Sequence, residues 1–192
     1  EDFGLLLRRE AFARGMAESA EVFFVGVGAA WVWELARVNF AHATEVLDYY
    51  HAREHLTKLV YGLVGQGTRA ANRLLEDWEE CLWEGEVDRL LKLARRKAKT
   101  LSLLGNKTVL TELKYLEKNR QRMRYAEFRR LGLFIGSGVV EAGCKRVIGQ
   151  RLKQSGMFWR ETGATAVASL RCALLSAGGW DYLWKPPLLQ AA

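Results

Sequence analysis

The sequence predicts a helix-rich α/β fold, in which a partial core of parallel strands and helices is interrupted by an all-helical insertion. Residues 21–64 alternate between short apolar runs rich in β-branched and aromatic residues and segments with helical periodicity, in the order strand, helix, strand, helix. Residues 67–121 show helical periodicity only. We therefore expect a partial core over residues 1–66, the insertion over 67–125, and a returning core over 126–192.

The partial core begins with a helix, which the spacing of apolar residues places at residues 3–18. "EVFFVGV" and "ATEVLDYY" are the two strands, and each is followed by a helix, in "AAWVWELARVNF" and in "HAREHLTKLVYGLV". Two strands joined by one helix favour parallel pairing, and such sheets gather their working groups at the carboxyl ends of the strands. Val27 and Asp48 occupy those ends.

The insertion contains three helices, separated by Gly85 and by the Gly105–Asn106 pair. Their sequences are "RAANRLLEDWEECLWEG", "EVDRLLKLARRKAK" and "NKTVLTELKYLEKNRQRM". The second of them carries a row of cations, which is either a solvated face or a nucleic-acid contact. The row consists of Arg89, Lys92, Arg95, Arg96, Lys97 and Lys99.

The returning core contains a helix from Gly138 to Lys153 and a final helix from Glu161 to Ser176. A helical projection places Glu141 on the apolar side of the first of these helices. A carboxylate that faces a core costs several kcal/mol unless it is neutralised, paired or bound to a metal ion. An ion pair with Lys145 or Arg151 and a role as a metal ligand are the two interpretations.

The charge of the chain favours a polyanionic partner. Among 192 residues, Lys and Arg outnumber Asp and Glu by 29 to 22, which gives a net charge of +7. Basic residues are dense around the Glu141 helix, and the candidates for DNA binding are Lys145, Arg146, Arg151, Lys153, Arg122 and Arg124. The three cysteines are far apart, which fits reduced thiols in the cytoplasm, and no apolar run is long enough to span a membrane.

The segment "DYYHAREH" places Asp48, His51 and His55 close together along the chain. The two histidines lie one helical turn apart, a spacing that can bind zinc. No cysteine lies near them and a third and fourth ligand are missing, so hydrogen bonds that hold or orient the site are the competing interpretation, and direct catalytic contact is the third.

Three blocks of the sequence together resemble a known family of enzymes. "FFVGVGAAWVWELA", "VLDYYHAREHL" and "IGSGVVEAGCKRVIGQRLKQSGMFW" are similar to the carboxyl-terminal part of ISKra-type insertion-sequence transposases. That group resembles the Mutator-like DDE transposases, which have an RNase H-like fold. The resemblance implies a mobile-element protein of bacterial DNA transposition and recombination, located in the cytoplasm with the nucleoid. Its partners would be transposon ends and target DNA, with copies of the chain itself as a candidate further partner.

The resemblance also implies a metal site. DDE transposases cut and join DNA with two Mg²⁺ ions held by two Asp and one Glu. Glu141 matches the Glu, as catalytic residue and metal ligand, and Asp48 and His51 match an Asp-x-x-His motif that supports the site. The second Asp is expected within "GDGAAW", where this sequence has Val27, and the first is expected upstream of Glu1.

The absence of these two carboxylates predicts a transposase fragment that is catalytically inactive, since valine cannot bind a cation. A non-catalytic basic module that binds nucleic acid is the alternative. A metal-dependent hydrolase centred on Asp48, His51 and His55 is a third hypothesis, and it requires bound zinc.

Overall fold

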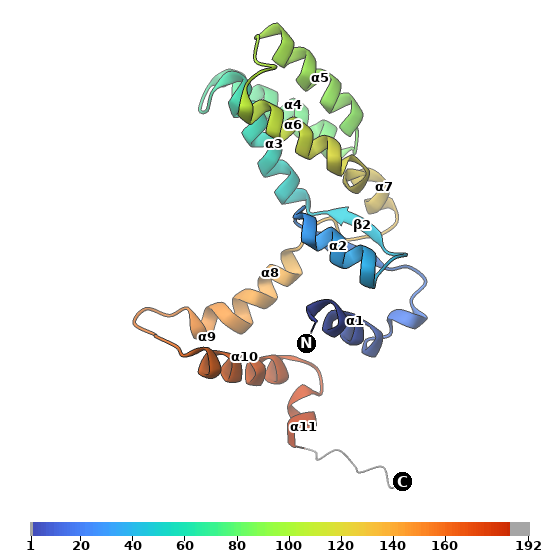
Figure 1. The fold of residues 1–192 in the computed structure, drawn as a ribbon, viewed down its shortest axis with the longest axis vertical. Helices are drawn as coiled ribbons and strands as arrows, with labels where there is room; N and C mark the ends of the chain where they lie inside the picture. Colours follow the sequence, from blue (N-terminus) through green and yellow to red (C-terminus); the bar gives the residue numbers. More distant parts are fainter. Residues whose placement is uncertain (1, 185–192) are drawn as a thin grey trace. The chain divides into compact units, whose positions relative to one another are not determined.

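The computed structural model describes residues 2–184, which form a helix-rich α/β structure with one parallel sheet of two strands (Figure 1). The chain divides into two compact units, Glu1–Ser137 and Gly138–Ala192. This division differs from the boundaries expected near residues 66 and 125, because the helical insertion packs into the first unit. The two units are described separately below.

The first unit begins with the strands and helices of the partial core. In chain order these are α1 (Phe3–Ala13), a 3-10 turn (Met16–Glu18), β1 (Phe23–Gly26), α2 (Ala30–Asn39), β2 (Thr44–Leu47) and α3 (Tyr49–Val64). The two strands pair in parallel, from Phe23 with Thr44 to Gly26 with Leu47, as the strand, helix, strand order predicts.

Two of the predicted boundaries were wrong, for local reasons. The helix predicted over residues 3–18 ends at Ala13, since Gly15 adopts a left-handed conformation with φ of 88°. The second strand was predicted to run to Tyr50 but ends at Leu47. Asp48 begins the next helix instead, because its side chain accepts a hydrogen bond from the backbone N–H of His51 at 2.8 Å.

The insertion consists of the three predicted helices, α4 (Arg69–Trp83), α5 (Val87–Thr100) and α6 (Lys107–Asn119). Thr68 and Asn106 cap α4 and α6 by accepting hydrogen bonds from the backbone N–H groups of Ala71 and Val109. Helix α3 packs against both α4 and α6, and α5 packs against α6 (Figure 1). One continuous core results, which contains Leu56 and Leu59 of α3 together with Leu90 of α5 and Leu116 of α6.

The chain then returns to the sheet through a 3-10 turn (Arg120–Met123) and α7 (Tyr125–Arg130). The hydroxyl of Tyr125 is buried and donates to the carbonyl of Leu47 at 3.0 Å. The backbone N–H of Tyr49 donates to the carbonyl of Ile135 at 2.8 Å. These two bonds hold residues 125–135 against the carboxyl end of β2.

The described part of the second unit contains helices, joined by loops, and no strand. It contains α8 (Gly138–Cys144), a π-helical turn (Lys145–Gly149), α9 (Gln150–Leu152), α10 (Glu161–Leu175) and α11 (Gly179–Trp184). The predicted helix over 138–153 therefore exists, but the π turn interrupts its α-helical repeat. Arg171 of α10 supports that turn by donating to the carbonyls of Val147 and Arg146. Across residues 2–184, no helix combines the length and the apolar character that crossing a membrane requires.

Candidate functional site

The carboxyl edge of the two-stranded sheet holds the residues that the sequence singled out in the partial core. Gly26 and Leu47 are the last pair of the ladder, so Val27 and Asp48 follow at the same edge. The side chain of Val27 is 43% exposed, whereas Asp48 is only 3% exposed. The two positions therefore differ sharply: one presents an apolar side chain to solvent and the other a buried carboxylate.

The carboxylate of Asp48 accepts hydrogen bonds from three protein donors. Its Oδ1 accepts from the backbone N–H of His51 at 2.8 Å. Its Oδ2 accepts from the backbone N–H of Ser137 at 2.6 Å and from the Ser137 hydroxyl at 2.8 Å. Asp48 thus caps α3 and anchors the segment that precedes α8. Each oxygen of the carboxylate therefore has at least one donor.

A second buried carboxylate lies between α3 and α6. Glu112 of α6 is 7% exposed, and its Oε2 lies 2.5 Å from Nδ1 of His55 on α3. Burial lowers the pKa of His55, and the hydrogen bond to Glu112 partly offsets this effect. At neutral pH the imidazole is therefore neutral, with Nδ1 protonated so that it donates to the carboxylate.

Tyr115 connects this pair to the end of β1. Its ring stacks on the imidazole of His55, with 3.5 Å between the ring centroids. Its hydroxyl donates a long hydrogen bond of 3.4 Å to the carbonyl of Val27. Burial raises the pKa of Tyr115 to about 12, so the hydroxyl keeps its proton at neutral pH. The insertion thus contacts the strand edge directly through α6.

Gly28 is the position at which this contact is tightest. Its φ is +83°, and a Cβ atom there would lie 2.0 Å from the Tyr115 hydroxyl oxygen. We expect Gly28→Ala to lower the free energy of unfolding by about 2 kcal/mol or more, because it adds a clash to an unfavourable backbone conformation. Urea unfolding measures this change. Gly67→Ala is the matched control, since Gly67 has φ of +74° and open space around it; equal losses in both variants would contradict the proposed clash.

His51 lies beside His55 but has a different environment. The two rings meet edge to face with centroids 5.2 Å apart, and Nδ1 of His51 is 3.7 Å from Oε2 of Glu54. The zinc hypothesis needs at least three ligands around one point. No group of three or more His, Cys, Asp or Glu side chains within residues 2–184 is arranged to hold a metal ion. The imidazole of His55 makes a hydrogen bond of the kind that the competing interpretation expects, with Glu112, whereas His51 makes its hydrogen bond to Asp48 through its backbone N–H.

Glu141 lies in the second unit, in α8. The prediction that it faces a core is wrong for the described structure, since Glu141 is exposed and no residue of α8 is buried. Val140, a member of the apolar arc in the projection, is 66% exposed. The projection also assumed one α-helical repeat through residue 153, and the π turn from Lys145 changes the phase of every later side chain.

The predicted DNA-binding residues fall into two groups. Arg122 is committed to internal contacts: its Nε lies 2.5 Å from Oε2 of Glu45, and its guanidinium lies 4.3 Å from the ring centre of Trp33. Arg124 pairs with Glu127 at 2.9 Å. The remaining four are exposed on the second unit, and they are Lys145, Arg146, Arg151 and Lys153. Among the six predicted DNA-binding residues, the four in the second unit are therefore the better candidates for contact with DNA.

The residues at the strand edge do not fit a site for two Mg²⁺ ions. Val27 offers no oxygen ligand, and both oxygens of Asp48 already accept hydrogen bonds from the protein. A cation at Asp48 would share a carboxylate that already caps α3 and accepts two hydrogen bonds from Ser137. No reaction step that uses a metal ion is therefore assigned to this edge.

Sequence reasoning missed Glu112, Tyr115 and Ser137 as parts of this site. Glu112 had a detectable signal, because it stands among Val109, Leu113 and Leu116 on the buried face of its helix. A carboxylate in an apolar row predicts a partner, although it does not identify which one. Tyr115 and the Ser137 link to Asp48 had no comparable local signal.

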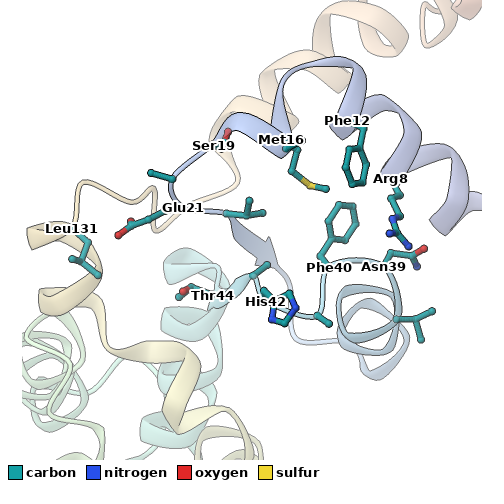
Figure 2. A pocket seen from close by; sticks show the side chains of 16 residues that line it. Arg8, Phe12, Met16, Ser19, Glu21, Asn39, Phe40, His42, Thr44 and Leu131 are labelled. Carbon is teal, nitrogen blue, oxygen red and sulfur yellow. The ribbon is translucent and has the colours of Figure 1, made fainter.

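A pocket lies at the other end of the sheet. It has a volume of about 570 Å³ and adjoins Val22, just before β1, and Thr44, the first residue of β2. Its apolar side chains include Phe12, Met16 and Phe40, which point toward one another in Figure 2. This pocket is therefore separate from Val27 and Asp48, which lie at the carboxyl ends of the strands.

Three comparisons with known proteins complete the description of the site. No protein-family model matches the chain. Neither the curated proteins nor the solved structures contain a significant match.

Proposed function

We propose that this chain is a DNA-binding fragment of a DDE-type transposase, with an RNase H-like origin, and that it binds DNA without cutting it. The three sequence blocks that resemble ISKra-type transposases support this origin. The parallel β1–α2–β2 unit followed by a helical insertion is compatible with an interrupted RNase H-like core. Fold-level similarity alone would not establish a function, so the proposal depends on the site.

The proposed lack of catalysis rests on the residues at the carboxyl edge of β1 and β2. Cleavage and strand transfer by this class require two cations about 3.5 to 4 Å apart. Here an exposed valine follows β1, and the carboxylate that follows β2, Asp48, already accepts three hydrogen bonds from His51 and Ser137. Glu141 by itself would not assemble such a pair of ions.

The charge of the chain supports DNA as its ligand. A net charge of +7 and clusters of exposed Lys and Arg on several helices fit a phosphodiester backbone. Contacts to phosphates do not require the missing carboxylates. Binding can therefore persist where catalysis is lost.

The experiment measures DNA binding and DNA cleavage with the same protein. We expect a fluorescent duplex to bind the chain with an affinity that falls linearly in a plot of log K against log salt concentration. Glu141→Gln should bind equally well, and supercoiled plasmid should remain intact with Mg²⁺ or Mn²⁺. An absence of binding at 50 mM salt would contradict DNA as the ligand. Metal-dependent nicking that disappears in Glu141→Gln would contradict the lack of catalysis.

A further inference from the structure

The α5–α6 hairpin carries an excess of positive charge that internal ion pairs do not neutralise. Residues 87–120 contain ten Lys and Arg against three Asp and Glu. Each of the three acids already has a partner: Asp88 lies 3.7 Å from Arg120, Glu112 pairs with His55, and Glu117 lies 2.7 Å from Arg95. Arg89 pairs with Glu86, which immediately precedes α5. Most of the basic side chains of the hairpin therefore have no acidic partner within residues 2–184.

These unpaired cations form two rows on neighbouring helices. At 100° per residue, Lys92, Arg96 and Lys99 fall on one side of α5, and Lys107, Lys114 and Lys118 fall on one side of α6. The pairs Arg95–Glu117 and Asp88–Arg120 show that the two helices run antiparallel, and Figure 1 shows them side by side. All six of these lysine and arginine side chains are exposed.

A groove of about 520 Å³ lies between the two helices. Arg95, Arg96 and Lys99 of α5 line one side, and Lys114 of α6 lies on the other. The single acid in its lining, Glu117, is the partner of Arg95 and so adds no free negative charge. The groove therefore has a net positive charge that the acids of residues 2–184 do not neutralise.

We propose that this groove binds the phosphodiester backbone of DNA, an inference that rests on the proposed function and locates its contact on the insertion. Each row extends beyond the groove along its helix, since Lys92 lies outside it on α5 and Lys107 and Lys118 lie outside it on α6. From Lys92 to Lys99 the row on α5 spans about 10 Å, given a rise of about 1.5 Å per residue. A row of that length can contact successive phosphates, because a strand carries one about every 3.4 Å along the duplex axis.

The floor of the groove does not favour an acidic amphipathic helix as the ligand. Leu104 and Leu110 are 45% and 37% exposed, whereas Leu113 is buried at 4%. Two partly exposed leucines offer less apolar surface than the row of anchors that an amphipathic helix lays into a groove. Contacts to phosphates require only Lys and Arg side chains, and these outnumber the acidic side chains on this surface.

The test compares two triple variants, each of which removes three positive charges, from two different surfaces. Arg96→Gln/Lys99→Gln/Lys114→Gln changes the groove, and Lys145→Gln/Arg146→Gln/Lys153→Gln changes the exposed basic residues of the second unit. Each replaces one Arg and two Lys at exposed positions, so both should fold. Affinity for a fluorescent 20-base-pair duplex is measured by anisotropy between 50 and 300 mM salt, and circular dichroism checks folding.

We expect the groove variant to bind the duplex about 100-fold more weakly at 0.1 M salt, with the slope of log K against log salt reduced by about 2 to 3. An unchanged slope and affinity in the groove variant, while the second-unit variant loses both, would overturn the inference and leave DNA as the ligand. A groove variant that keeps its DNA affinity but loses binding to a labelled acidic helical peptide would also overturn it. No DNA binding by the unaltered chain would instead contradict the proposed function itself.

Discussion

Asp48→Ala should lower the free energy of unfolding by about 3 to 5 kcal/mol, the largest loss that we expect from one side chain. The substitution removes three hydrogen bonds to a buried carboxylate, from the N–H of His51 and from the N–H and hydroxyl of Ser137. Hydrogen bonds to charged groups contribute about 1.5 to 3 kcal/mol each, and an N-cap about 1 kcal/mol, although such terms are not additive. The partly buried donors left without acceptors add to the cost.

Two variants separate the contributions to this loss. Asp48→Asn keeps one side-chain oxygen as an acceptor, so about half of the effect should remain. Ser137→Ala removes only the hydroxyl donor, for which we expect about 1 kcal/mol. Urea unfolding monitored by circular dichroism measures the free energy of unfolding of all three variants. A loss below about 1 kcal/mol in Asp48→Ala would show that the carboxylate does not hold the strand edge together.

The second large effect is expected at the His55–Glu112 pair. Replacing Glu112 with Leu should lower the free energy of unfolding by about 2 to 3 kcal/mol, because Nδ1–H of His55 is then largely buried without this acceptor. The double variant His55→Leu/Glu112→Leu should lose less than the sum of the two single variants, since it removes both polar partners together. Additive losses would contradict a specific pair between α3 and α6.

The pH dependence of stability provides a second measurement of the same pair. The pKa of His55 is lowered from 6.5 by burial, against the opposing effect of Glu112. The unfolded chain therefore takes up a proton near pH 6.5 that the folded protein takes up only at lower pH. The contribution of His55 to the free energy of unfolding is fully present above pH 6.5. It decreases as the pH falls toward the pKa of the folded state, with a slope of at most about 1.4 kcal/mol per pH unit.

Unfolding at pH 7.5 and at pH 5.5 tests this sign. The unaltered protein should be less stable at pH 5.5, and His55→Leu should reduce that difference. His51→Gln is the control, because His51 lies on the same helix but is more exposed than His55. A protein that becomes more stable on acidification would show that the ion pair with Glu112, and not burial, dominates the pKa of His55.

Local patterns in the sequence determined which elements form and in what order. Strand-like runs separated by a helical pattern predicted the parallel pair β1 and β2, and Val27 and Asp48 do follow at one edge. The helices of the insertion were predicted in the same way, since three- and four-residue spacing of apolar side chains is a local property. The row of cations along α5 was likewise apparent from spacing alone.

Only the tertiary structure decided which side chains meet. Ser137 contacts Asp48 across 89 residues, Tyr115 contacts Val27 across 88, and Glu112 contacts His55 across 57. Such contacts depend on how whole helices pack, which no local repeat encodes. The same reason explains why Glu141, placed on a buried face by periodicity, is exposed: a helical projection gives the direction of a side chain but not what packs against it.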